Sequence, residues 1–300
     1  MNSKPCNLCP RKCNTIRPAG FCRSPQEPVI ARAALHHWEE PVISGTRGSG
    51  TIFFSGCNLK CVFCQNYGIS TNLEGIPVTA YRMRQICEEL IEQGAHNINF
   101  VTPTHYTEVI LECLKTPLPV PVVYNTNGYD SVETLKRLEG KVQIYLPDLK
   151  YSSNVLASAY SSAPDYVEKA TAAIQEMYRQ TGPYRMDEEQ GLLQSGVVIR
   201  HLILPSAIRN SLGVINWVTD HFRSGEILFS LMRQYLPFGK VSDTMYPELN
   251  RKVTDEEYQI IEDALFDTGF EDGFVQDCES AVEDFIPPFD GTGVTSKADQ

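Results

Sequence analysis

Residues 51–64 read TIFFSGCNLKCVFC, so a short apolar strand runs directly into three closely spaced cysteines, Cys57, Cys61 and Cys64. The spacing is C-x3-C-x2-C, and the aromatic Phe63 stands before the last cysteine. Three thiolates on one tight loop can hold three irons of a cubic iron–sulfur cluster. No fourth cysteine follows at regular spacing, so one iron would keep an open coordination position. The loop therefore predicts a catalytic 4Fe-4S cluster; a zinc site or a chance group of cysteines is the alternative.

Outward from this loop, short apolar runs alternate with amphipathic segments, which is typical of βα units in a parallel sheet. We predict an α/β fold, specifically an open, partial (β/α)6 barrel, because six units are too few for a closed barrel of eight. The six predicted strands are Thr51–Ser55, Asn97–Thr102, Pro121–Thr126, Val142–Asp148, Val197–Leu204 and Glu226–Met232.

Helical periodicity and capping indicate three helices in particular. Apolar side chains recur on one face at Met83, Ile86, Cys87, Leu90 and Ile91, and again at Val167, Ala170, Thr171, Ile174 and Met177. Thr254 and Glu257 form a capping-box pattern, which opens a last helix running to about Gly269.

Three segments differ in composition. Residues 1–45 form a Cys-rich, metal-binding extension, residues 46–240 the partial barrel, and residues 241–300 a last helix with an irregular tail. Residues 253–300 hold 14 acidic side chains and one basic one, whereas the whole chain has a net charge of −11. We interpret the acidic stretch as a solvated face, with docking as the alternative. The chain has no long basic face, which argues against nucleic acid as a ligand.

Composition also indicates the class of protein and the compartment to expect. The chain has 300 residues, of which 42% are hydrophobic and 21% charged, as in a globular protein with a large core. No run of about 18 apolar residues occurs, so we expect no membrane span. The first residues lead into cysteines and not into the apolar stretch of a secretory signal, so we expect a cytoplasmic protein.

The cysteine loop resembles the C-x3-C-x-aromatic-C motif that defines the radical S-adenosylmethionine (SAM) superfamily, in which it also follows the first strand of a partial barrel. Further segments resemble the branch related to pyruvate formate-lyase-activating enzymes, over most of residues 45–240. The N-terminal cysteines and the tail resemble only an uncharacterised subgroup of activating-enzyme-like proteins. The segments that carry the likeness are Gly48–Gly56, Gln65-Asn66, Asn125–Tyr129 and Asp148–Lys150.

The resemblance implies a mechanism. The SAM amino and carboxylate groups chelate the open iron, and the reduced cluster donates an electron that cleaves the sulfonium into methionine and a 5′-deoxyadenosyl radical. This radical abstracts hydrogen from a substrate, which could be a glycine of a partner glycyl-radical enzyme, a peptide or a small molecule. A small reductant such as ferredoxin or flavodoxin would supply the electron. The alternative is a non-catalytic metal-binding or electron-relay protein.

The resemblance also implies SAM contacts at the strand ends. After the second strand the family usually has a Gly-Gly-Glu-like stretch for the SAM amino group, whereas this chain offers the hydroxyls of Thr102 and Thr104. Thr104 as a helix N-cap is the alternative. Asn125 and Asn127 could bind the ribose or carboxylate of SAM. Relatives have an aspartate at position 125 in a small-cation site, and since the amide weakens such a site, no cation is predicted.

The ends of the last three predicted strands add four candidate SAM contacts. Asp148 and Lys150 share one face of their strand, and the resemblance puts both near SAM, with an ordinary salt bridge as the alternative. Arg200 matches an arginine that pairs with the SAM carboxylate in relatives. Gln234, with the adjacent Tyr235, could close the adenosine pocket. Before the barrel, His36–Glu40 could cap the site or simply be exposed.

The N-terminal cysteines Cys6, Cys9, Cys13 and Cys22 follow a C-x2-C-x3-C-x8-C spacing. Four soft ligands in 17 residues suit a tetrahedral metal, so we predict a structural zinc knuckle, with a second iron–sulfur cluster as the alternative. A disulfide framework would need an oxidising compartment, which nothing indicates. The remaining cysteines, Cys87, Cys113 and Cys278, are interpreted as structural.

Overall fold

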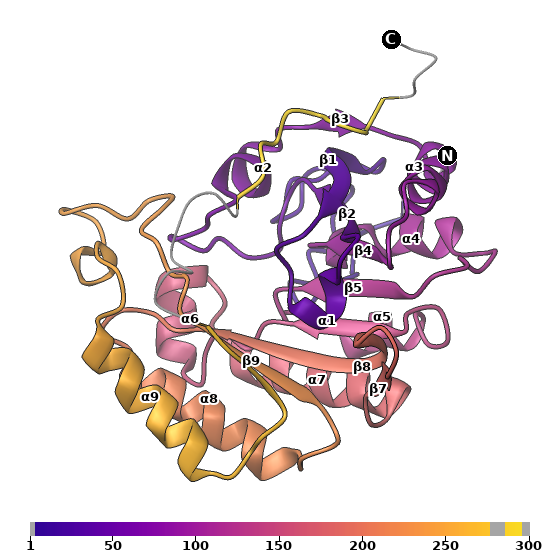
Figure 1. The fold of residues 1–300 in the computed structure, drawn as a ribbon. Coiled ribbons are helices and arrows are strands. Elements are labelled where there is room, and N and C mark those ends of the chain that lie inside the picture. Colours follow the sequence, from indigo (N-terminus) through magenta and orange to yellow (C-terminus); the bar gives the residue numbers. More distant parts are fainter. Residues whose placement is uncertain (1–3, 277–285, 296–300) are drawn as a thin grey trace.

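The computed structural model describes residues 4–276 and 286–295. Its centre is a ten-stranded sheet in the order β10-β9-β8-β6-β5-β4-β2-β1-β3, with β7 paired to β8 (Figure 1). Six of its parallel strands follow one another in chain order, each bonded to the next. They are β2 (Ser49–Phe54), β4 (Ile98–Val101), β5 (Val122–Thr126), β6 (Ile144–Pro147), β8 (Leu192–Leu202) and β9 (Leu228–Met232). These are the six predicted strands, so the partial barrel is confirmed.

Four further strands were not predicted. β1 (Val29–His36) and β3 (Ile76–Pro77) extend one edge in antiparallel fashion, and β7 (Arg185–Asp187) and β10 (Gly273–Val275) lie near the other. β1 was missed because two of its buried residues, Ala31 and Ala33, are small and weaken the apolar pattern. Residues 29–36 therefore belong to the sheet, although they fall within the predicted extension. The division of the chain into three domains stays a prediction.

Helices connect the parallel strands and cover the outer face of the sheet (Figure 1). The predicted apolar faces lie on α3 (Ala80–Glu92) and α7 (Tyr166–Thr181), and both are buried there. The capping box is present at the start of α9 (Asp255–Asp267), which ends two residues before the expected Gly269. The other helices are α1 (Pro41–Ser44), α2 (Tyr67–Asn72), η1 (Thr104–Tyr106), α4 (Thr107–Cys113), α5 (Val132–Lys136), α6 (Asn154–Ser161), α8 (Ile208–His221) and η2 (Pro247–Leu249).

The C-terminal tail is more regular than expected. β10 pairs in parallel with β9, and the segment after residue 286 runs along β1 at the opposite edge of the sheet. There Gly291 N donates to Ala31 O and Ala33 N to Thr292 O, both at 2.9 Å. Part of the acidic stretch, and Cys278, lie outside the described residues.

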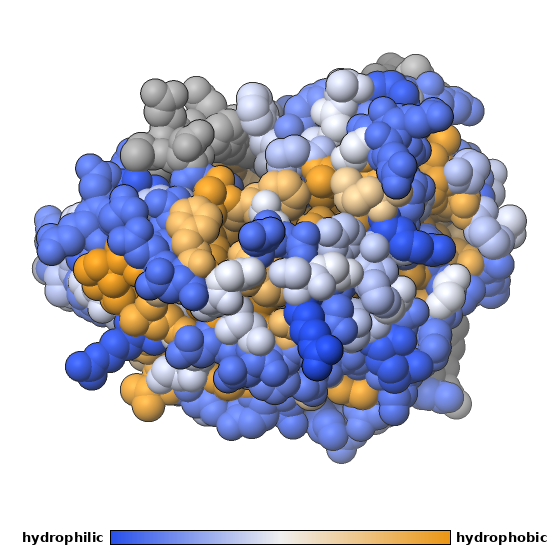
Figure 2. All heavy atoms as spheres, turned by 60° about the horizontal axis from the view of Figure 1, so that its bottom comes forward, coloured by the Kyte–Doolittle hydropathy of each residue, from blue (hydrophilic) through white to orange (hydrophobic). Residues whose placement is uncertain are grey.

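Apolar side chains fill the space between sheet and helices, and the predicted structural cysteines Cys87 and Cys113 are buried in this core with their sulfurs 3.9 Å apart. Figure 2 shows a face covered mainly by hydrophilic residues, with hydrophobic ones gathered in a band across its upper half. Within residues 4–276 and 286–295, no helix combines the length and the apolar character that crossing a bilayer requires.

Candidate active site

The three-cysteine loop leaves the carboxyl end of β2 through Gly56, whose φ of +88° favours glycine. A Cβ at Gly56 would also overlap Ser24 Oγ, so the N-terminal segment packs directly against this turn. The loop is thereby fixed at the edge of the sheet where the parallel strands end, which is where α/β folds bind their ligands.

Each loop cysteine has polar neighbours that suit a metal-bound sulfur. Cys57 Sγ accepts hydrogen bonds from Leu59 N at 3.4 Å and from Asn127 Nδ2 at 3.3 Å. Cys61 Sγ accepts from Ser161 Oγ at 2.9 Å, and Cys64 Sγ lies 3.3 Å from Ser70 Oγ. Such hydrogen bonds stabilise thiolates and tune the potential of iron–sulfur clusters.

Burial makes it hard for the loop cysteines to lose their protons and become thiolates unless a metal binds them. Burial raises the pKa of Cys57 to about 12 and that of Cys61 to about 11, although the nearby Lys150 opposes the shift at Cys61. Without a metal the thiols would stay protonated at neutral pH, because metal binding must displace their protons.

The donor set of the loop suits a cluster. In a cubic cluster each cysteine binds its own iron, so Cys57, Cys61 and Cys64 can hold three of the four irons and leave one open. The residues of the loop therefore fit a 4Fe-4S cluster.

A cavity of about 250 Å³ opens beside the loop and is lined by Cys61, Cys64 and predicted residues from four other strand ends. These are Asn125, Asp148, Lys150, Arg200 and Gln234. His36, Trp38 and Glu39 also line it, so the segment 36–40 contributes to the site, while Ile286 and Pro287 of the tail close one side.

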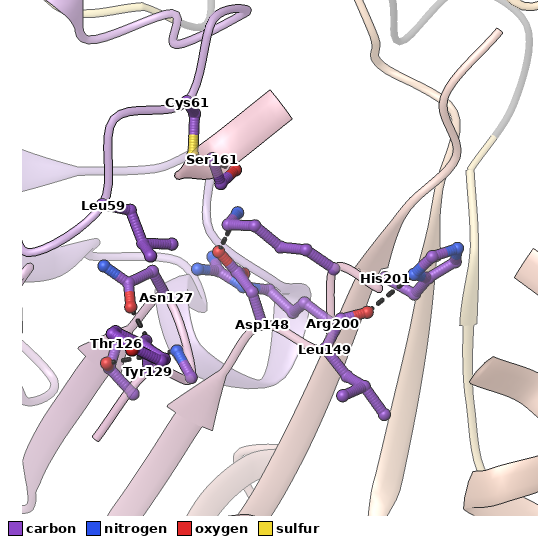
Figure 3. Close-up of polar contacts among 12 residues, drawn as sticks. Leu59, Cys61, Thr126, Asn127, Tyr129, Asp148, Leu149, Ser161, Arg200 and His201 are labelled. Carbon is purple, nitrogen blue, oxygen red and sulfur yellow. Dashed lines mark hydrogen bonds and ion pairs between the residues drawn. The ribbon is translucent and has the colours of Figure 1, made fainter. Parts of the chain in front are cut away.

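Charged side chains form a connected network in this cavity (Figure 3). Asp148 accepts from Lys150 Nζ at 2.6 Å and from Arg200 Nε at 3.0 Å, and Arg200 Nη2 donates to Asn125 Oδ1 at 2.6 Å. Burial opposes the ionisation of Asp148, but the two cations more than compensate and lower its pKa. The salt bridge that was the alternative interpretation of Asp148 and Lys150 is present, and both residues also line the cavity.

Glu39 is a further member of the network; it was predicted only as part of the segment His36–Glu40, without a role of its own. Its Oε2 lies 3.2 Å from Arg200 Nη1, and its Oε1 accepts from Asn125 Nδ2 at 3.1 Å and Asn99 Nδ2 at 3.2 Å. Burial raises the pKa of Glu39. Asn99, a polar residue inside an apolar strand, was the available signal that something polar lies inside the barrel.

Three predicted SAM contacts lie elsewhere, since the lining found for the cavity includes none of them. Thr102 adopts a φ of +58° at the end of β4, and Thr104 Oγ1 lies 3.3 Å from Thr126 Oγ1 in the core. Thr104 is not a helix N-cap either, because Pro103 holds that place before η1. Asn127 forms a turn by accepting from Tyr129 N at 3.0 Å, and its amide contacts Cys57.

The structure also shows where Gln234 and Tyr235, which follow β9, and His201, next to Arg200, lie. Gln234 lines the cavity and its backbone O accepts from Gln65 Nε2 at 3.3 Å, while Tyr235 is buried with its ring 5.8 Å from that of Phe63. Arg200 faces the barrel interior as expected, whereas His201 points away from it (Figure 3). His201 is held by Leu149 O at 2.7 Å.

Comparison with known proteins places the chain in a family. No model of a protein family matches it. The uncharacterized protein MJ0674 of Methanocaldococcus jannaschii is 32% identical over 275 residues, which cover 87% of this chain and 73% of that protein. The chain belongs to the family of this archaeal protein. Family membership by itself assigns no activity.

Solved structures show the fold. SuiB of Streptococcus suis, a radical SAM enzyme solved with S-adenosylmethionine bound, matches 75% of this chain at 13% identity with a TM-score of 0.50. The chain spans about half the length of SuiB, since the match covers 49% of it. A domain of a pyruvate-formate lyase-activating enzyme from Bacteroides vulgatus also matches, at 16% identity, over 60% of this chain and 98% of the domain, with a TM-score of 0.43. The match to SuiB shows a shared fold, as the predicted partial barrel requires.

Proposed function

We propose that this protein is a radical SAM enzyme. The observation that carries the proposal is the position of Cys57, Cys61 and Cys64 at the end of β2, beside a cavity into which five polar residues from other strand ends project. A 4Fe-4S cluster on these cysteines would supply the electron that cleaves SAM reductively. SuiB, which has the same fold, binds SAM.

The protein's own side chains would bind and orient SAM. Arg200 presents a guanidinium suited to a carboxylate, and Lys150 adds a second positive charge. Asp148 and Glu39 offer acceptors for an ammonium group. Asn125 and Gln234 provide amides that can hydrogen-bond the ribose or the adenine. Trp38, Phe53 and Phe63 line the same cavity and exclude water from it.

The electron donor and the substrate belong to this proposal as well. A small protein of the ferredoxin or flavodoxin class would reduce the cluster, and the hydrogen donor is a protein, peptide or small molecule that reaches the cavity. A glycyl-radical enzyme is one such protein substrate. The cysteines in the described part of the chain are all free, which supports a reducing, cytoplasmic setting.

Anaerobic incubation of the reconstituted protein with SAM and dithionite tests the activity. We expect 5′-deoxyadenosine and methionine from the wild type, none from Cys61→Ala, and wild-type amounts from the control Cys87→Ala, whose sulfur lies in the core. If the wild type binds a cluster but forms no 5′-deoxyadenosine, the non-catalytic electron-relay function replaces this one.

A further inference from the structure

The four N-terminal cysteines surround a cavity of their own. Backbone hydrogen bonds fold the segment tightly, since Cys6 N donates to Thr15 O at 2.9 Å and Lys12 N donates to Cys9 O at 3.0 Å. All four cysteines of this segment, Cys6, Cys9, Cys13 and Cys22, line one small cavity. Its lining also includes Arg11, Arg17, Phe21, Ser24, Asn58 and His105.

Polar atoms around this cavity lack partners. Among the described residues, four buried side-chain atoms near it make no hydrogen bond: Arg11 Nη2, Thr15 Oγ1, Lys60 Nζ and His105 Nδ1. Burying a polar atom without a partner is costly, so such a concentration points to a bound polar group. Three of these atoms are donors, and they require an acceptor.

Among these buried atoms without a hydrogen bond, His105 Nδ1 is an acceptor with a free lone pair. His105 is 1% exposed, and its Nε2 lies 2.9 Å from Ser55 O. Because a carbonyl oxygen only accepts, Nε2 carries the proton and Nδ1 is unprotonated. The surroundings thus present a lone pair together with donors, and a group that combines metal ions with hydrogen-bond acceptors satisfies both. Iron with inorganic sulfide has this composition, whereas a lone zinc ion brings no acceptor.

The number of thiols agrees with this choice. Cys6, Cys9, Cys13 and Cys22 line one cavity, so they can supply one ligand to each iron of a cubic cluster.

Positive charges complete the site and join it to the three-cysteine loop. Arg17 Nη2 lies 3.7 Å from Cys6 Sγ, and the Arg11 guanidinium lies 3.8 Å above the ring of Phe21. Arg11 Nε also donates to Asn58 O at 2.9 Å, within the loop. Lys60 is within electrostatic reach of both Cys22 and Cys57. These cations offset the negative charge that four thiolates bring.

We propose that Cys6, Cys9, Cys13 and Cys22 bind a second iron–sulfur cluster, beside the cluster of the three-cysteine loop. The proposal takes the iron–sulfur alternative in place of our first choice of zinc at the same cysteines. The site stands on its own contacts, so it can exist whether or not the protein cleaves SAM.

Metal analysis of two complementary variants tests the proposal. The full chain is purified and reconstituted anaerobically, and iron, zinc and acid-labile sulfide are measured, with electron paramagnetic resonance after dithionite reduction. The triple variant Cys57→Ala, Cys61→Ala, Cys64→Ala should keep about four irons per chain and a reduced-cluster signal. The quadruple variant Cys6→Ala, Cys9→Ala, Cys13→Ala, Cys22→Ala should lose that signal and keep the other, and Cys87→Ala should match the wild type.

The outcomes separate the two proposals. A folded triple variant without iron, or with one zinc per chain, overturns the second cluster. If instead the triple variant keeps its iron and the quadruple variant binds none, the second cluster stands and the proposed loop cluster fails. Because the quadruple change can unfold the segment, Cys22→Ser in the triple background is the second variant: an unchanged signal there excludes Cys22 as a ligand and overturns the four-cysteine site.

Discussion

Asn127 donates a hydrogen bond from Nδ2 to Cys57 Sγ at 3.3 Å, so the turn after β5 directly contacts the cysteine loop after β2. The same amide reaches Asn58 Oδ1 at 2.8 Å, which fixes its orientation. The structure thus places Asn127 against the sulfur of the proposed cluster, and not in the cavity that would hold SAM.

This contact predicts an effect on reduction potential. A hydrogen bond to a cysteine sulfur stabilises the more negative, reduced cluster, so Asn127→Leu should lower the potential of the loop cluster. One neutral hydrogen bond contributes about 1 kcal/mol, which is roughly 40 mV for one electron. Redox titration followed by electron paramagnetic resonance measures the shift, and Asn216→Leu, at an exposed position of α8, is the control. An unchanged potential would show that the contact has no electronic role.

A second prediction concerns Arg200, which binds Asp148, Asn125 and Glu39 at once. Arg200→Lys keeps the charge but loses the planar fork, so we expect SAM affinity to fall about tenfold. Arg200→Met removes the cationic partner of Glu39 and leaves Asp148 paired with Lys150 alone, so it should lower the free energy of unfolding by about 3 kcal/mol.

Calorimetric titration with SAM and urea unfolding measure the two effects separately. Arg179→Lys is the matched control, because Arg179 also binds two carboxylates but lies on the surface, half exposed. If Arg200→Lys bound SAM as tightly as the wild type, Arg200 would hold the network together without contacting the ligand.

The sequence specified the parallel core well, because each strand is a short apolar run followed by a turn. It also located Asn125, Asp148, Lys150, Arg200 and Gln234 at one cavity, because parallel strands end at one edge of the sheet. Residues after β4 could not be placed in this way. The left-handed backbone of Thr102 and the short η1 turn Thr104 into the core, and a strand period does not reveal such a change of direction.

Contacts between distant segments were also beyond sequence reasoning. Glu39 reaches Arg200 across 161 positions of the chain, and no local pattern encodes that pairing. β1 likewise joins the sheet by an antiparallel register with β2 that depends on the whole barrel edge.

Helix α9 supplies a prediction for stability alone. Glu257 N donates to Thr254 Oγ1 at 3.2 Å, and Glu257 Oε2 accepts from Thr254 N at 3.0 Å. Thr254→Ala should lower the free energy of unfolding by about 1 kcal/mol, because one helix N–H loses its partner. Urea unfolding measures this loss, and SAM binding should not change. A loss of SAM binding would instead mean that α9 is coupled to the cavity.

The last prediction is a pH dependence centred on His201, which is 0% exposed and bonded to Leu149 O at 2.7 Å and Ser211 Oγ at 2.9 Å. Burial lowers its pKa from 6.5 to about 4. Between these values the unfolded chain binds a proton that the folded chain does not. The contribution of His201 to the free energy of unfolding is therefore complete above pH 6.5 and is lost as the pH falls toward 4.

At pH 5 we expect the free energy of unfolding to be lower by roughly 2 kcal/mol than at pH 7.5 because of this residue. Urea unfolding of the wild type and His201→Gln at both pH values checks this. The variant should be less stable at pH 7.5 but show a weaker pH dependence; an equal pH dependence in both proteins would exclude His201 as its source.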